Sequence, residues 1–225
     1  VPKLSLVFRG LAGVKERIPI SQALEVADRA DMVLSANVLL RHASGASLLA
    51  WSAYVGNTTA LSMLRPHWAK LDPYEAIIVG DLPVLTAAIA GGWDGNALSP
   101  DGFTPLGLAA FFGNEPAFDL LLPLTRDVNQ QATNPQKVAA LHAATARRSG
   151  SMVQKLLRAG ANPNLAQVQD VTALHVAAAN GDNPIAVMLL TAGADPALKD
   201  ASGLDASAHA RAKGHVWLAT RLSQA

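Results

Sequence analysis

Histidine is the residue type in this 225-residue chain that is best suited to acid–base catalysis or metal binding. An imidazole titrates near neutral pH, and its ring nitrogens bind transition metals. Of the six histidines, His142 and His175 have the most similar surroundings, because each follows a leucine and precedes small apolar residues. The two are far apart along the chain, however, whereas two ligands on one helix face stand at i, i+4 spacing. The spacing therefore favours one repeated structural position over a shared reactive site.

Motifs of other familiar active sites are absent. The chain has no cysteine, which excludes disulfides, cysteine-based zinc sites and thiol catalysis. It contains no Gly-x-Ser-x-Gly, His-Glu-x-x-His, Walker or Gly-x-Gly-x-x-Gly motif. The glycine-rich stretch 91–96 lacks the regular acidic spacing of a calcium loop, so we expect a turn there. We expect no catalytic residue, no metal and no cofactor.

Residues 1–45 hold the acid–base groups that belong to no recognisable pattern: Glu16, Glu25, Asp28, Asp31 and His42. They form no motif, and the segment is too short for a separate catalytic domain. An enzyme subunit with its active residues in this segment is the alternative that we favour least.

Composition and charge exclude further classes of function. Hydrophobic residues make up 50% of the chain, and no run approaches the roughly twenty apolar residues of a membrane span. The net charge of +1 divides into +4 over residues 1–70, −7 over 71–134 and +4 over 135–225. Arg147, Arg148 and Lys213 form no long basic run with interleaved aromatics, so we expect no nucleic acid.

We expect a cytoplasmic protein. Because the chain begins at Val1 rather than at methionine, the alternative is a periplasmic or secreted protein that has lost an upstream signal.

The elements that position these residues follow from an internal repeat. Four segments align without gaps, and their equivalent positions recur about every 33 residues, at Leu106, Leu141, Leu174 and Ser207. Thr104 precedes Pro105, the combination that favours a capped helix start. The aligned segments share paired alanines, a Leu-Leu pair and glycines at two turns: Gly113, Gly181 and Gly214 at the first, Gly160 and Gly193 at the second. The period predicts helical hairpins that stack and share one apolar seam.

From about residue 97 to 224 the chain resembles the ankyrin repeat family, whose units combine a Thr-Pro-Leu-His-x-Ala-Ala helix start with a Gly-Ala-Asp ending. The resemblance implies an all-α solenoid of stacked helix-turn-helix units, with short β-hairpin fingers in the C-terminal half. It also implies that His142 and His175 make side-chain-to-backbone hydrogen bonds between adjacent repeats. For His209 and His215, in the last unit, it implies a structural role as well.

Toward the N-terminus the pattern weakens but keeps its phase over residues 47–64 and 73–92. Leu49, Pro73 and Leu106 are equivalent positions. The interval from Pro73 to Leu106 is a full repeat, whereas that from Leu49 to Pro73 is clearly shorter and predicts a missing finger. Residues 21–41 are expected to form an N-terminal cap, because terminal repeats are atypical. We therefore expect a repeat domain over residues 21–225 with six to seven units, preceded by an extension over 1–20 without an assignment.

In ankyrin proteins the usual contact surface is the concave side, made of the finger tips and one face of each first helix. Carried over to this sequence, the partner-binding residues are Tyr54, Ile78, Val79, Trp93, Asp94, Asp101, Phe103, Phe111, Phe112, Val138 and Arg147. The N-terminal half of this surface is aromatic and aliphatic, with an acidic rim at Trp93, Asp94 and Asp101. We expect a partner with an apolar knob and a basic surround. In the alternative interpretation, residues 1–20 cover the groove and the aromatics are core.

The expected function is protein–protein interaction by a monomer, as an adaptor or as an inhibitor, self-protection or immunity partner of an enzyme. The alanine-rich, irregular repeats are similar in style to bacterial ankyrin proteins. A self-associating scaffold that uses the apolar groove to dimerise is the alternative.

Overall fold

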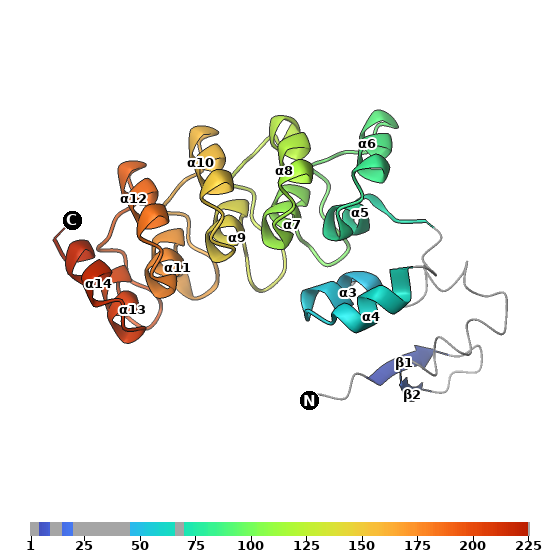
Figure 1. The fold of residues 1–225 in the computed structure, drawn as a ribbon, viewed down its shortest axis with the longest axis horizontal. Coiled ribbons are helices and arrows are strands. Elements are labelled where there is room, and N and C mark those ends of the chain that lie inside the picture. Colours follow the sequence, from blue (N-terminus) through green and yellow to red (C-terminus); the bar gives the residue numbers. More distant parts are fainter. Residues whose placement is uncertain (1–4, 10–14, 20–45, 66–69, 225) are drawn as a thin grey trace. The chain divides into compact units, whose positions relative to one another are not determined.

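The computed structural model of the chain describes residues 5–9, 15–19, 46–65 and 70–224 (Figure 1). The chain divides into two compact units, residues 1–75 and 76–225, and the boundary lies inside helix α5 (Pro73–Val79). The predicted N-terminal cap over residues 21–41 lies outside the described residues, as do His42 and His67.

The first unit contains a β-hairpin and a helix pair. Strands β1 (Ser5–Arg9) and β2 (Lys15–Pro19) pair antiparallel with Ser5 opposite Pro19. This hairpin falls in the extension that the sequence left without an assignment. Helices α3 (Leu48–Tyr54) and α4 (Thr58–Leu64) form the predicted pair. The hydroxyl of Ser47 caps α3 by accepting the Ala50 N–H at 3.1 Å.

The connection between α4 and α5 is short, as the repeat spacing predicts. It comprises residues 65–72, whereas residues 91–104 connect α6 (Leu82–Ala90) with α7 (Pro105–Phe112). Positions 66–69 of the shorter connection are not among the described residues.

The second unit continues as helix pairs that stand side by side in Figure 1. The first helix of each pair is α7, α9, α11 or α13, and the second helix is α8, α10, α12 or α14. The bounds of the helices after α7 are Glu115–Leu121 (α8), Ala140–Ala146 (α9), Gly150–Arg158 (α10), Ala173–Asn180 (α11), Asn183–Thr191 (α12), Ala206–Ala212 (α13) and Val216–Leu222 (α14). Short 3-10 turns lie at Leu122–Leu124 (η2) and Val168–Asp170 (η3). No helix among the described residues is long and apolar enough to cross a membrane.

Side-chain caps fix where these helices begin. Thr104 accepts the Gly107 N–H at 3.0 Å, with Pro105 at the first helical position, as predicted. The second helices begin at polar residues directly after the turn: Asn114 caps α8 and Asp182 caps α12. Each cap satisfies a backbone N–H that has no partner within its own helix.

The core is the seam between consecutive pairs. Helix α7 packs against α9, α9 against α11, and α11 against α13. Their facing surfaces are buried alanine pairs at 109–110, 143–144 and 177–178, whose small side chains let the helix backbones approach closely. The second helices add larger buried side chains: Phe118, Leu121, Met152, Leu156, Ile185 and Leu189.

The fingers differ from the prediction in detail. They are tight turns rather than two-stranded hairpins, with isolated β-bridges at Ala166–Thr172 and Lys199–Asp205. Neighbouring fingers are joined by backbone hydrogen bonds: Thr133 donates to Gly102, Val168 to Gln136 and Ala201 to Gln169, at 2.9, 3.1 and 2.9 Å. Each finger is too short for a regular ladder, so its backbone groups pair partly with the next finger.

Because the seam is buried, two alanine substitutions in helix α8 should differ greatly in their effect on the free energy of unfolding. Phe118 is 0% exposed, so Phe118→Ala should lower the free energy of unfolding by about 3–5 kcal/mol through the cavity it leaves. Leu120, on the same helix, is 37% exposed, and Leu120→Ala should cost less than about 1 kcal/mol. Denaturant unfolding of both variants measures this, and equal losses would contradict the stacking of α8 described above.

Candidate functional site

The two histidines in equivalent positions bridge neighbouring repeats. The Nε2 atom of His142 lies 2.8 Å from the Leu165 carbonyl oxygen, and that of His175 lies 3.2 Å from the Leu204 carbonyl oxygen. Each Nδ1 accepts the N–H of the residue that starts its own helix, Ala139 or Thr172, at 3.2 Å. Both bonds form together when the ring is neutral and carries its proton on Nε2. The predicted structural role of these histidines is confirmed.

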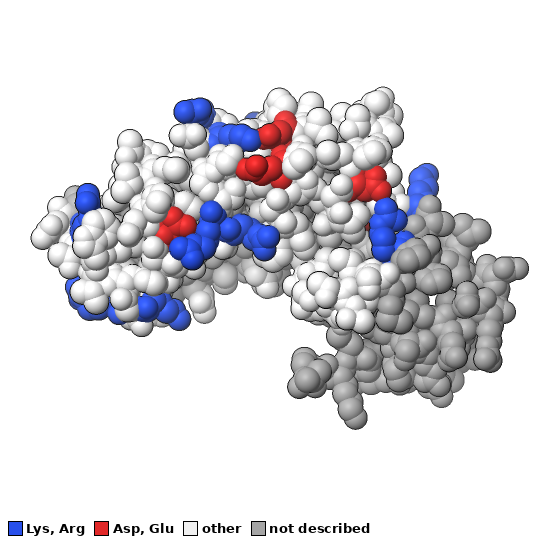
Figure 2. All heavy atoms as spheres, in the orientation of Figure 1, with Lys and Arg blue, Asp and Glu red and all other residues white. Residues whose placement is uncertain are grey.

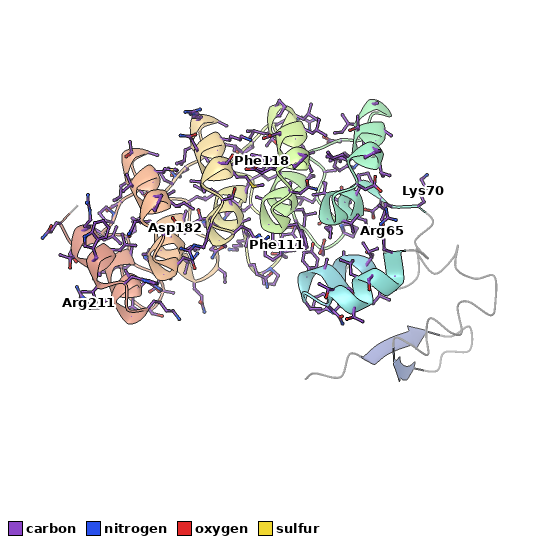
Figure 3. All side chains as sticks on the ribbon, viewed as in Figure 1. Arg65, Lys70, Phe111, Phe118, Asp182 and Arg211 are labelled. Atoms are coloured by element: carbon purple, nitrogen blue, oxygen red, sulfur yellow. The ribbon has the colours of Figure 1, made fainter. Side chains whose placement is uncertain are left out.

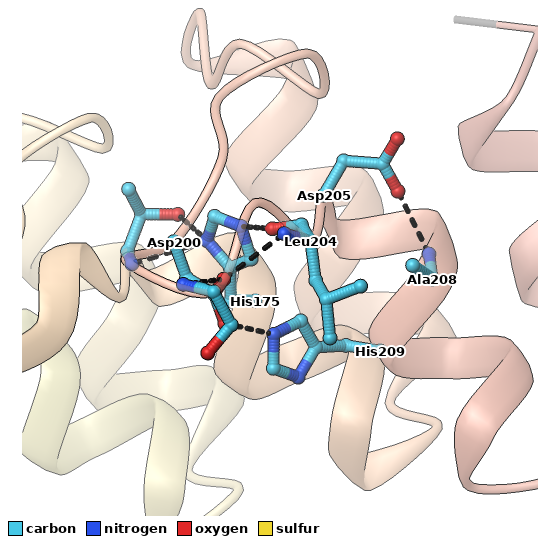
Figure 4. A network of polar contacts seen from close by, with 8 residues as sticks. His175, Asp200, Leu204, Asp205, Ala208 and His209 are labelled. Carbon is cyan, nitrogen blue, oxygen red and sulfur yellow. Dashed lines mark hydrogen bonds and ion pairs between the residues drawn. The ribbon is translucent and has the colours of Figure 1, made fainter.

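His175 belongs to a larger polar network in the last two repeats (Figure 4). One carboxylate oxygen of Asp200 accepts the backbone N–H groups of Leu204 and Ser202, at 3.0 and 2.8 Å. The other lies 2.8 Å from Nε2 of His209, and the rings of His209 and His175 meet edge to face with centroids 5.2 Å apart. These hydrogen bonds, with that from Leu204 the largest cause, lower the pKa of Asp200. The network fastens the last repeat to its neighbour.

The described residues contain no group of three or more histidine, aspartate or glutamate side chains that could hold a metal ion. A small, partly open pocket of about 10 Å³ lies among Gly95, Thr104 and Ala140, which is room for about one water molecule. The polar groups described above make structural contacts, so the surface is the remaining place to look for function.

Aromatic side chains are exposed where α7 ends. Phe111 is 41% exposed and Phe112 is half-buried, and their rings meet edge to face with centroids 5.1 Å apart. Figure 3 shows Phe111 at the lower edge of the helix row, whereas Phe118 lies within it. Within the second unit, Phe111 thus lies at the surface of the helix row rather than in the seam.

Arg147 lies beside the phenylalanine pair although it comes from the next repeat. A Cβ atom on Gly113, the residue after Phe112, would meet a guanidinium nitrogen of Arg147 at 3.2 Å. Gly113 also ends α7 with a left-handed φ of 70°, so the guanidinium lies at the helix C-terminus, where positive charge is favourable. The structure therefore brings together three of the predicted contact residues, Phe111, Phe112 and Arg147.

Arg148 is a feature that the sequence analysis missed. It occupies the repeat position of Gly113 and Gly181, and like them it is left-handed, with a φ of 60°. Its Nε lies 3.2 Å from a carboxylate oxygen of Asp182, the cap of α12. The alignment of the repeats could have identified Arg148, because it places this arginine where the neighbouring repeats have glycine.

We call the ends of the first helices the turn edge and define it by Phe111, Phe112, Arg147, Arg148 and Lys213. Figure 2 shows basic side chains gathered around the lower ends of α9 and α11, with one acidic group beside them, and further basic side chains at α13. In Figure 3 the labelled Asp182 lies on the same side as Phe111. The turn edge thus changes from aromatic to basic along the second unit.

The predicted acidic rim does not lie at the turn edge. Asp94 accepts hydrogen bonds from Asn96 and forms an ion pair with Arg126 at 3.4 Å. Asn96 in turn donates to the Leu124 carbonyl, beyond the C-terminal end of α8. Phe112 adjoins the opposite end of that helix, about 10 Å away along its axis. The half-buried Trp93 belongs to the same loop as Asp94.

The other predicted contact residues are placed as follows. Ile78, on α5, is buried at 9% exposed and offers little surface to a partner. Val79, Phe103 and Val138 are half-buried, and the carboxylate of Asp101 accepts the Ser99 hydroxyl at 2.6 Å. Tyr54 ends α3 in the first unit.

The repeat pattern has a counterpart among protein families. A family model described as "Ankyrin repeats (3 copies)" matches residues 74–167 and 126–200, together more than half of the chain. A search of curated proteins found no match.

The neutral histidine bridges predict a pH dependence of stability. Burial lowers the pKa of His142 and His175 below the ordinary 6.5, and hydrogen bonds to backbone carbonyls oppose it only in part. The unfolded chain therefore binds more protons than the folded chain as the pH falls through that value. The free energy of unfolding should decrease from about pH 7.5 to about pH 5.5, and the loss should be smaller in His142→Gln.

Denaturant unfolding at both pH values measures this difference. Equal pH dependence in wild type and His142→Gln would contradict the neutral bridge.

Proposed function

The chain belongs to the ankyrin repeat family, and we propose that it binds a partner protein through the turn edge of its first helices. Ankyrin repeats are generally protein–protein interaction modules. The observation that carries the proposal is the phenylalanine pair at the end of α7, in which Phe111 is 41% exposed, with the Arg147 guanidinium at the adjoining Gly113. Aromatic side chains and arginine are the residue types that dominate the energetics of protein interfaces.

The role that we propose for this binding is that of an adaptor, or of an inhibitor, self-protection or immunity partner of an enzyme. It rests on the similarity in style between these alanine-rich, irregular repeats and those of bacterial ankyrin proteins. We also propose that the chain itself is not an enzyme, which accords with the structural use of His142, His175 and His209.

The phenylalanine pair is the first place to test the proposal. Phe111→Ala should abolish retention of the native partner in an affinity pull-down from extract of the source cells. Phe111 is partly exposed, so thermal unfolding should change far less than in Phe118→Ala. Leu120→Ala is the matched control, since it removes a similarly exposed apolar side chain from a second helix and should retain the partner. A Phe111→Ala variant that retains the same protein as wild type would contradict the proposal.

Self-association through the same aromatics is the competing role, and light scattering separates the two. We expect a monomer at high protein concentration, because two copies would bring like charges at Arg147 and Arg148 together. A dimer that Phe111→Ala converts to monomer would favour the self-associating scaffold.

A further inference from the structure

We infer that the turn edge recognises an acidic segment of the partner protein, with carboxylates placed beside one apolar side chain. This inference rests on the proposed function and names the chemistry of the partner. It reverses the sequence-based expectation of a partner with a basic surround.

The first step is the uncompensated charge of Arg147. Across residues 46–65 and 70–224, no carboxylate lies within ion-pair distance of its guanidinium. The guanidinium lies at Gly113, the residue that follows Phe112, and no described carboxylate neutralises it there. A planar guanidinium with free donors is the best protein group for binding a carboxylate through two parallel hydrogen bonds.

The second step is the backbone of Arg148. A left-handed conformation costs a residue with a Cβ atom free energy that glycine does not lose, and the flanking repeats have Gly113 and Gly181 there. The Arg148 side chain is 58% exposed and makes one ion pair, so donors remain for a second carboxylate.

The third step concerns the carboxylates at the turn edge. Two carboxylates lie at these turns. Asp182 has a side chain that is 10% exposed, and it is used twice, by Arg148 and by the Ile185 N–H. Glu115, two residues after Gly113, is exposed and forms no ion pair with a described residue. Lys213, at the equivalent turn of the last repeat, is exposed and has no ion pair with any described residue. From Phe111 to Lys213 the edge thus carries three cations against two carboxylates, and Arg148 already binds one of the two. Arg147 and Lys213 remain for acidic groups of a partner.

A protein segment fits this surface better than a nucleic acid does. Three cations along the edge are few for a phosphate backbone, whose binding scales with the number of phosphates neutralised. The net charge of the whole chain is only +1. An exposed aromatic pair beside a guanidinium suits an acidic residue next to a leucine or phenylalanine.

Defined peptides test the inference. Random dodecapeptides displayed on phage would be selected on the full chain, and enriched sequences would be synthesised for titration at near-physiological and at high salt. We expect enrichment of peptides with at least two acidic residues beside an apolar one, and weaker binding at high salt. Arg147→Glu should weaken this binding at least about tenfold. Arg158→Glu changes the net charge equally but lies on α10, and it should bind like wild type.

The outcomes separate this inference from the proposed function. Enriched peptides without acidic residues, bound through Phe111 but unaffected by Arg147→Glu or Arg147→Gln, would overturn the inference and leave the protein-binding surface standing. Peptides insensitive to Phe111→Ala and Arg147→Glu alike would overturn both, and no enrichment at all would overturn the inference. Tighter, Arg147-dependent binding of mixed-sequence single-stranded DNA than of any peptide would assign the edge to nucleic acid instead. Thermal unfolding of Arg147→Glu and Arg147→Gln shows whether each variant is folded.

Discussion

The structure depends on apolar contact between successive helix pairs. A single pair of helices of seven to nine residues cannot bury its own apolar face, so each pair needs a neighbour on at least one side. Paired alanines make this contact close enough for polar groups to reach across it as well. The Nε2 atoms of His142 and His175 reach a carbonyl of the next repeat because the first helices are so near one another. Stacking, capping and histidine bridging are thus consequences of one spacing.

The same spacing explains how much of the fold could be predicted from the sequence. The regular period places most turn glycines and buried leucines in register, so helix starts such as Thr104-Pro105 and the roles of His142 and His175 followed from alignment. Local detail did not follow. The fingers share their backbone hydrogen bonds with neighbouring fingers, which no pattern of residues within one finger reveals. The hairpin at residues 5–9 and 15–19 lies outside the repeat, so the alignment did not predict it.

The candidate site was predictable in part, for a geometric reason. Aligned repeats indicate which residues face outward, and Phe111, Phe112 and Arg147 were identified in this way. Aligned repeats do not show which end of a helix a loop adjoins, or which charged side chains a loop neutralises. Asp94 looks like a free acidic group in the sequence, yet Asn96 and Arg126 satisfy it at the far end of α8. Ile78 matches an outward position, but the packing of α5 buries it.

The turn edge is where the repeat can vary without disturbing the stack. Residues at the seam are mostly small or apolar and buried, whereas several at the helix ends are exposed and tolerate other chemistry. Arg148 shows how far this tolerance extends, since a left-handed arginine costs roughly 1–2 kcal/mol of backbone energy. Its ion pair with Asp182, whose side chain is only 10% exposed, joins the turns of two neighbouring repeats and offsets part of that cost. Arginine at position 148 therefore gives up the conformational freedom of glycine for a contact between repeats that only a side chain can make.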